Sequence, residues 1–264
     1  MTIKDVLNCI TEVAPLQWQE DYDNAGLQVG DLSAEALKAL ICLDITEAIV
    51  DEAVAKNCNV IVSHHPLIFH GLKHLTPQTY IERAVMKAIK HDIAMISMHT
   101  NLDNSYLGVS RMLAERLGLK NLHLLQPSVA EPEACGAGMI GEFEIPLEET
   151  DFLSLVANKI GTPCLRHSAL MGRKIKKVAL CGGSGSPFMS DALKNHADAY
   201  LTADIKYHDF FIPEGNILLV DGGHFETEQF TKELLYELIR KKFPTFAAEI
   251  AETRTNAVYY FVKN

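Results

Sequence analysis

The 264-residue sequence predicts an α/β protein of two interlinked lobes, each with a mostly parallel sheet covered by helices. Short apolar runs alternate with segments of helical period through the first half of the chain. A similar alternation resumes after a stretch rich in Pro, Gly and acidic residues at 126–138. We therefore expect a first lobe over residues 1–125 and a second lobe over 126–224. A C-terminal segment from about 225 to 264 is expected to pack back on the first lobe.

The first lobe is expected to alternate strand and helix three times. Its strands are short buried apolar runs, and its helices carry apolar side chains on one face. Thr46 is a suitable N-cap for the first of these helices, and Gly118 ends the last one. The expected strands are 39–43, 59–63 and 93–98, and the expected helices are 46–56, 80–90 and 105–117.

The second lobe is expected to repeat this pattern with more strands. The longest helix of the chain is expected over 225–242, followed by a closing strand over 257–262. The other expected strands are 139–145, 162–167, 177–181, 199–202 and 216–220, and the other expected helices are 149–159 and one that runs to His196.

Composition excludes several classes of protein. The net charge of −10 and the pI near 5.5 disfavour nucleic-acid binding, and the one basic run, 173–177, is expected to be a solvated strand start. The six cysteines form no C-x-x-C pair, which is typical of a reduced, cytoplasmic chain. We see neither a signal-peptide pattern nor an apolar run of about 20 residues, so we expect no membrane partner.

Imidazole and carboxylate side chains follow several of the expected strands. His64 and His65 come after strand 59–63, His99 and Asp103 after strand 93–98, and His224 after strand 216–220. In open α/β sheets ligands bind beyond the carboxyl ends of the strands. His224 and Glu228 are four residues apart at a helix start, so they share one face.

Such a ligand set suits a borderline divalent metal, namely Zn, Fe, Mn, Co or Ni. His64 and His65 can each reach a different ion, Asp103 can bridge two ions, and a two-metal site can activate water. His99 would ligate or would orient Asp103. Asp44 would likewise ligate a metal or orient Asp103, or would simply cap the helix that follows it. Glu226 is expected to be solvated. Six other histidines are expected to be ordinary surface or core residues: His70, His74, His91, His123, His167 and His196.

The glycine-rich loop Gly182–Ser186 has two interpretations. It lies between a strand and a helix, where backbone N–H groups can cradle a phosphate. It lacks the lysine of a Walker motif and the full dinucleotide fingerprint, so a tight structural turn is the alternative. The chain contains no G-x-S-x-G motif and no recognisable nucleophilic triad.

Six sequence blocks stand out along the chain: DNAGLQVG at 23–30, SHHPLIF at 63–69, HTNLD at 99–103, CGGSG at 181–185, LTADIKYH at 201–208 and DGGHFETE at 221–228. Taken together, these blocks resemble the NIF-three-like family, whose members are named GTP cyclohydrolase 1 type 2 homologues. The similarity covers nearly the whole chain, and the S-H-H-P-L-I-F and G-H-x-x-T-E blocks are highly specific.

The resemblance implies a NIF-three-like fold of two α/β lobes around a dinuclear site, with two divalent ions per chain. It carries the metal ligands onto His64, His65, Asp103, His224 and Glu228. It also implies a ring-shaped homohexamer. Ala203 and Ser110 depart from the family's usual glycine and asparagine, which concerns substrate contacts more than metal binding.

Two hypotheses about function follow. The first is a metal-dependent hydrolase of a small molecule, acting on a nucleotide, a purine-ring C–N bond or a phosphoester, with His99 or Glu228 assisting proton transfer. The second is a non-catalytic regulatory or interaction ring that uses the metal for ligand sensing or assembly.

Overall fold

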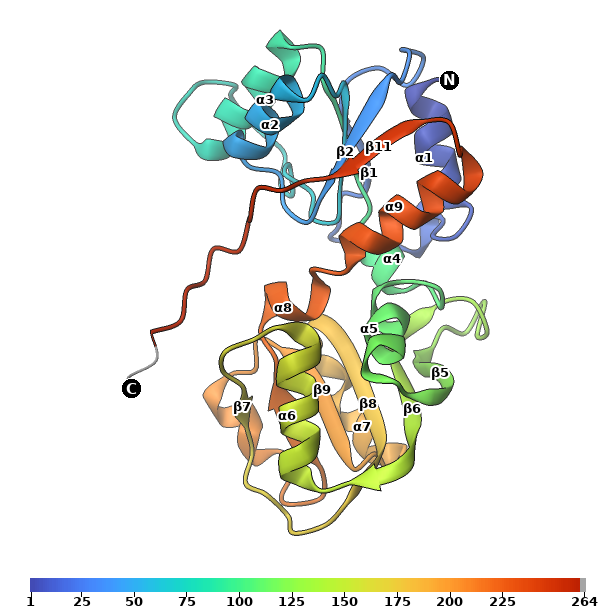
Figure 1. The fold of residues 1–264 in the computed structure, drawn as a ribbon, viewed down its shortest axis with the longest axis vertical. Helices are drawn as coiled ribbons and strands as arrows, with labels where there is room; N and C mark the ends of the chain where they lie inside the picture. The colour runs from blue at the N-terminus through green and yellow to red at the C-terminus, as the bar shows by residue number, and fades with distance from the viewer. Residues whose placement is uncertain (262–264) are drawn as a thin grey trace. The chain divides into compact units, whose positions relative to one another are not determined.

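Two α/β units make up the chain in this computed structural model, which describes residues 1–261 (Figure 1). Unit 1 consists of residues 1–102 and 231–257, and unit 2 consists of residues 103–230 and the chain from residue 258. The stretch 126–138, where the sequence suggested a junction between lobes, lies inside unit 2, and part of it links two paired strands.

Unit 1 contains a five-stranded sheet in the order β1-β4-β3-β2-β11. The last four strands in this order are mutually parallel, and β1 pairs antiparallel with β4. The mostly parallel sheet predicted for the first lobe is therefore confirmed. The strands are β1 (Gly26–Val29), β2 (Lys38–Cys42), β3 (Val60–Ser63), β4 (Ala94–Ser97) and β11 (Ala247–Ile250).

Helices cover both faces of this sheet (Figure 1). On one face, α2 (Glu47–Ala55) and α3 (Tyr80–Lys90) pack their apolar sides on Leu40, Ile61 and Met95. On the other face lie α1 (Ile3–Thr11) and α9 (Thr231–Lys242), which contact each other. The predicted N-cap is confirmed, because the Thr46 hydroxyl accepts a hydrogen bond from the Ile49 amide. The remaining short helices are η1 (Leu16–Trp18) and α4 (Thr100–Asp103).

Unit 2 contains a six-stranded sheet in the order β5-β6-β8-β9-β10-β7. Only the β8–β9 and β9–β10 pairs are parallel, so the sheet is mixed and not mostly parallel as predicted. The difference arises because the other three pairs, β5–β6, β6–β8 and β10–β7, are antiparallel, which the sequence pattern did not reveal. The strands are β5 (Lys120–Pro127), β6 (Gly136–Leu147), β7 (Arg166–His167), β8 (Ile175–Ser184), β9 (Ala199–Ala203) and β10 (Leu218–Asp221).

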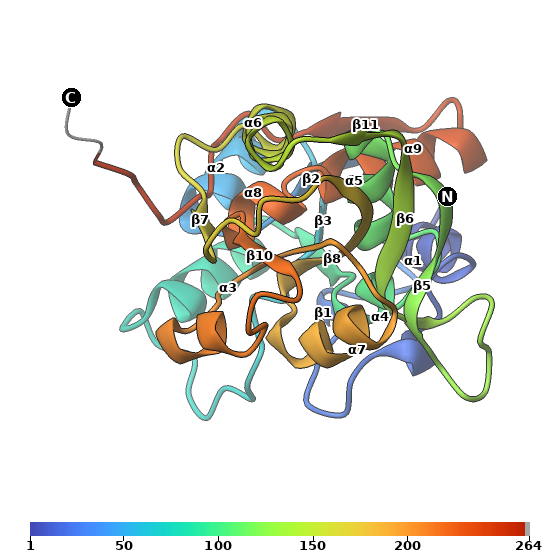
Figure 2. The same ribbon diagram turned by 90° about the horizontal axis from the view of Figure 1, so that it is seen from below.

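The helices of unit 2 also lie on both faces of the sheet, with α6 and α7 on opposite sides (Figures 1 and 2). α5 (Val109–Leu117) and α6 (Glu149–Ile160) pack against Leu201 and Val220, and α7 (Met189–Lys194) packs against Tyr200. Gly118 ends α5 in the left-handed conformation, as predicted. The short helices are η2 (Ser186–Phe188), η3 (Tyr207–Phe211) and α8 (His224–Glu228).

Two predicted elements near the C-terminus are wrong. The single helix predicted over 225–242 is divided into α8 and α9, and the division coincides with the boundary between the units at residue 230. The closing strand predicted over 257–262 is absent from 257–261, and residue 262 lies outside the described residues. The strand that completes the sheet of unit 1 is instead β11, which pairs with β2.

Within the described part of the chain, no helix has both the length and the apolar character needed to cross a membrane.

Candidate metal centre

Three histidines gather at the carboxyl ends of β3 and β4 in unit 1. One ring nitrogen from each of His64, His65 and His99 lies within 4.8 Å of the other two. The ring centroids are 4.7 Å apart for His64 and His65, and 5.4 and 5.5 Å from these two rings to His99. His64 is fully buried. Three imidazoles converging at one sheet edge are a donor set for a divalent metal.

The Nδ1 atom of each histidine is hydrogen-bonded to an oxygen. His64 Nδ1 lies 2.8 Å from the Met98 carbonyl, His65 Nδ1 lies 2.7 Å from Asp44 Oδ1, and His99 Nδ1 lies 2.7 Å from Asp23 Oδ1. A ring nitrogen that faces such an acceptor carries the hydrogen, so the lone pair of the neutral ring is on Nε2. Metal-binding histidines have this arrangement, with a carboxylate or carbonyl behind the ring.

Further hydrogen bonds hold the two carboxylates in place. The Thr255 hydroxyl donates to Asp44 Oδ2 at 2.7 Å, and the Thr100 amide and hydroxyl both donate to Asp23. Burial alone would raise the pKa of Asp23, but hydrogen bonds from His99 and Thr100 outweigh it and hold the pKa at about 2. Asp23 is therefore ionised at neutral pH and is a strong acceptor for His99.

The strand ends explain why His64 and His65 lie at this edge. Backbone pairing continues past β3, because the His65 amide donates to the Leu43 carbonyl at 3.0 Å. The Ser63 hydroxyl donates to the His65 carbonyl at 2.8 Å, and Pro66 follows, which favours an extended backbone at His65. The side chains of His64 and His65 therefore project from an ordered strand end.

A second ligand group lies in unit 2, where α8 follows β10. His224 Nδ1 is 2.7 Å from Asp204 Oδ2, and His224 Nε2 is 3.1 Å from Glu228 Oε2. Burial opposes charging of the ring, but the carboxylates of Asp204 and Glu228 raise the pKa of His224 to about 11. The carboxylates of Asp204 and Glu228 thus favour a positive charge between them. This charge can be carried by the imidazolium form of His224, or by a metal ion that His224 and Glu228 would hold.

The glycine-rich loop packs against this group. Gly183 has φ +60°, and a Cβ atom at this position would overlap Glu228 Oε1. The Gly183 amide donates to the Thr227 hydroxyl at 3.0 Å, and the Gly185 amide donates to the Thr202 hydroxyl at 2.8 Å. Because these N–H groups are bonded within the protein, the structure favours the tight turn over the phosphate cradle.

Asp103 is the last residue of α4 and the first residue of unit 2. Its charge acts on Cys181 in the same unit. Burial raises the pKa of the Cys181 thiol, and the negative charges of Asp103 and Glu228 raise it further. The thiol is kept neutral, which argues against a nucleophilic role for it.

The sequence had left the roles of several neighbouring residues open. Asp44 orients His65, and Thr46 caps α2. Glu226, expected to be solvated, is buried with 3% exposure, so that prediction was wrong. Asp23 and Asp204, which hold His99 and His224, were not singled out as partners. Asp204 directly follows β9 and Asp23 lies in a motif block, but their partners are 20 and 76 residues away.

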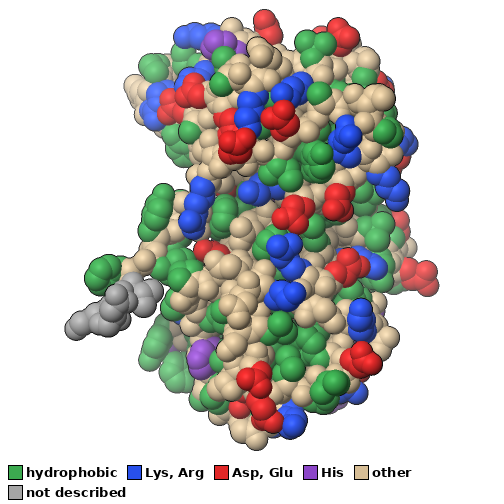
Figure 3. Space-filling view, in the orientation of Figure 1, with side chains coloured by type: hydrophobic (Ala, Val, Ile, Leu, Met, Phe, Trp, Pro, Cys, Tyr) green, Lys and Arg blue, Asp and Glu red, His purple; other side chains and the backbone are tan. Residues whose placement is uncertain are grey.

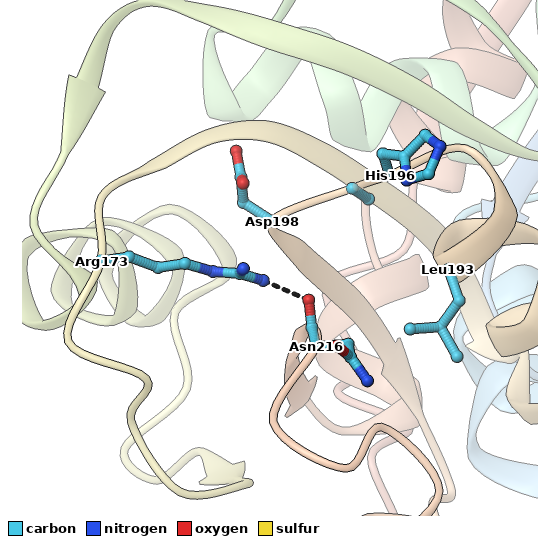
Figure 4. A pocket seen from close by; sticks show the side chains of 6 residues that line it. Arg173, Leu193, His196, Asp198 and Asn216 are labelled. Carbon is cyan, nitrogen blue, oxygen red and sulfur yellow. Dashed lines mark hydrogen bonds between the residues drawn. The ribbon is translucent and has the colours of Figure 1, made fainter.

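The basic run 173–177 borders a pocket of about 500 Å³ at the amino ends of β9 and β10 (Figure 4). Arg173 donates to the Asn216 carbonyl there, and the amides of Lys176 and Lys177 donate to Asp198. The pocket lies at the end of the strands opposite to His224. These bonds fit the predicted strand start.

The fold and the ligand groups define an α/β protein with histidine–carboxylate groups suited to divalent metal. A family model described as Duf34/NIF3 (NGG1p interacting factor 3) matches residues 1–257, and the chain belongs to this family. The resemblance inferred from the sequence motifs is confirmed.

Related proteins share this similarity over most of their length. A Clostridium perfringens protein named GTP cyclohydrolase 1 type 2 homolog is 34% identical over 231 residues, covering 86% of this chain and 87% of the relative. A Campylobacter jejuni protein of the same name is 32% identical over 241 residues, covering 89% and 90%. The crystal structure of Staphylococcus aureus hypothetical protein SA1388 superposes with a TM-score of 0.91 at 29% identity, covering 99% of both chains.

Proposed function

We propose that this protein is a divalent-metal-dependent hydrolase with a dinuclear centre. His64, His65, Asp103, His224 and Glu228 would hold the two ions, with Asp103 as the bridging carboxylate. The observation that carries the proposal is the common orientation of the histidines: His64, His65 and His224 each turn Nδ1 to a fixed oxygen acceptor, as metal-binding histidines do. Zn, Fe, Mn, Co and Ni all suit this donor set.

When bound, two such ions supply Lewis acidity and lower the pKa of water. The protein's own groups would orient the ligands and manage protons. Asp44 and Asp204 fix the rings of His65 and His224. His99, held by Asp23, and Glu228 are the candidates for proton transfer. Relatives are named after GTP cyclohydrolase, so a nucleotide is the first substrate class to test, as a purine-ring C–N bond or a phosphoester.

Elemental analysis of protein purified without added metal or affinity tag tests the centre. We expect two ions per chain in the wild type and a loss of metal in Asp103→Ala and in His224→Ala. His123→Ala is the matched control, because His123 is an exposed histidine on β5 outside both ligand groups. A wild type that stays empty after incubation with Zn, Mn and Fe would contradict the proposal.

Turnover is tested with the metal-loaded protein. Nucleoside triphosphates, phosphodiesters and amides would be screened, with His123→Ala as the positive control and Asp103→Ala as the negative control. Absence of hydrolysis across the screen, with full metal content, would leave the centre intact and reject the hydrolase.

The family's description as an interacting factor favours a second candidate, a non-catalytic metal-binding ring. In this version the chain assembles as a homohexamer, and the metal controls assembly or the binding of a partner. It predicts that removing the metal changes the oligomeric state although no substrate is turned over. Light scattering with and without a chelator separates the two candidates.

A further inference from the structure

The chain from residue 258 to residue 261, which we call the C-terminal arm, exposes unusual apolar surface. Its sequence, Val-Tyr-Tyr-Phe, is typical of a strand, but it belongs to neither sheet. Tyr259 is 82% exposed and Phe261 is 94% exposed. Figure 1 draws this segment as extended chain, and Figure 3 shows apolar side chains along it.

The arm is anchored at its middle. The Tyr260 side chain reaches the chain at Gly223, where an added Cβ atom would lie 3.0 Å from the Tyr260 hydroxyl oxygen. Tyr260 is accordingly the least exposed residue of the arm, at 38%. In an extended chain, successive side chains point to opposite sides. Tyr259 and Phe261 therefore face away from the surface that holds Tyr260.

A second exposed apolar surface lies on η3 of the same unit. We call Tyr207, Phe211 and Ile212 the aromatic patch. Their exposures are 72%, 64% and 54%, and the rings of Tyr207 and Phe211 lie edge to face with centroids 5.6 Å apart. Clustered apolar side chains of this kind on a protein surface mark an interaction site.

We propose that the C-terminal arm of one copy packs on the aromatic patch of a second copy, and that the contact is returned across a two-fold axis. Each copy carries one arm and one patch, so a two-fold pair satisfies both at once. The net charge of −10 makes copies repel each other, so a contact between them requires apolar surface. The arm and the patch residues are all uncharged.

The area is sufficient for a stable pair. At 150–250 Å² for each aromatic side chain, the exposed fractions of Tyr259, Phe261, Tyr207 and Phe211 amount to roughly 600 Å² per copy. The reciprocal contact would bury about 1,200 Å², which is the lower end of specific interfaces. Val258 and Ile212 add to this area.

The proposal gives the homo-oligomer proposed above a contact surface, and in that respect rests on it. It is independent of the metal. A homohexamer that survives loss of the arm contact would leave the proposed assembly standing and would overturn the arm contact alone.

Sedimentation and light scattering over a concentration series provide the first test. We expect Tyr259→Ser with Phe261→Ser, and Tyr207→Ser with Phe211→Ser, each to weaken association at least tenfold. The matched control is Val129→Ser with Ile145→Ser, two exposed apolar residues of unit 2 outside the arm and patch, which should associate like the wild type. Equal association of all variants, or a monomeric wild type, would overturn the proposal.

Disulfide trapping identifies the partner surface. In a Cys164→Ser background, which removes the exposed cysteine, chains carrying Phe261→Cys are mixed with chains carrying Tyr207→Cys and oxidised. We expect mixed dimers to exceed both like dimers. A predominance of arm-to-arm dimers would reject the patch as partner. A chain with both substitutions that closes its own disulfide as a monomer would reject the second copy.

Discussion

At the scale of single residues, the orientation of the imidazoles depends on acceptors that lie far away in sequence. Asp204 accepts from His224, Asp44 from His65 and Asp23 from His99. Each acceptor fixes a ring and makes its Nε2 a better ligand. The candidate ligand residues were chosen from their positions after strands, whereas these acceptors could not be, because pairing across 20 or more residues has no local sequence signal.

Removing such an acceptor should weaken metal binding without removing a ligand. We expect Asp204→Ala to lower metal affinity about 10- to 100-fold, and Asp204→Asn to have a smaller effect, because the amide oxygen still accepts from His224 Nδ1. Competition with a chromophoric chelator measures both. Asp151→Ala, an exposed carboxylate on α6, is the control. Equal affinity in all three variants would show that Asp204 does not support the ligand.

Gly183 permits a second test at this scale. We expect Gly183→Ala to displace the Glu228 carboxylate and to lower metal content as Glu228→Ala does, because the added methyl group overlaps Oε1. Gly172→Ala separates this contact from backbone strain, since Gly172 has φ +71° and no atom within 4 Å of the added Cβ. Metal loss in both glycine variants would assign the effect to general strain.

At the scale of elements, helices and strands were predicted correctly where the local apolar periodicity and capping residues determine the structure. α3 begins and ends at the predicted residues, and its N-terminus has a capping box formed by Thr79 and Glu82. The helix predicted over 225–242 failed because its apolar period continues through a boundary between units, which periodicity does not detect. The aromatic run after residue 257 failed because strand propensity does not supply a strand partner.

Glu52 connects α2 with the segment after β11 and makes stability depend on pH. It accepts from the amides of Glu252 and Thr253 and pairs with Lys56 at 2.9 Å. Burial alone would raise the pKa of Glu52, but these bonds hold it at about 2, below the value of about 4.3 in an unfolded chain. The ionised form therefore stabilises unit 1 above pH 5, and this contribution is lost as the pH falls toward 2.

We expect Glu52→Gln to lower the free energy of unfolding by about 1–2 kcal/mol at pH 7. The difference from the wild type should shrink as the pH falls from 5 to 3. Urea denaturation at several pH values measures it. Glu144→Gln, at an exposed position of β6, is the control. A difference that stays constant with pH would contradict the proposed role of the charge.

At the scale of the whole molecule, membership of the family and the two-sheet α/β architecture could be predicted from the motif blocks and the alternation of elements. The composition of the units could not. The segment 231–257 returns to unit 1, where β11 pairs with β2 in parallel register from Ala247 to Ile250. Such pairing over some 200 residues is decided by the sheet edge that β2 offers, and not by the segment's own sequence.

Metal removal should destabilise the protein as a whole. A ligand that binds only the folded state at 100 times its Kd adds about 2.7 kcal/mol, which corresponds to a shift in Tm of roughly 5–10 °C for a chain of this size. We expect a chelator to lower the Tm of the wild type by this amount. The double variant His224→Ala with Glu228→Ala should show no response. An equal response in both would assign the stabilisation to a different site.

The return of residues 231–257 to unit 1 also sets an order of events during synthesis. Residues 103–230 of unit 2 leave the ribosome before β11 exists, so most of unit 2 is available to fold while the β2 edge is still unpaired. During this interval β2, a run of buried apolar residues, is open to pairing with other nascent chains. The segment 231–257 therefore protects the edge of a strand synthesised about two hundred residues earlier, and a chain whose synthesis stops before this segment would expose that edge and be prone to aggregate.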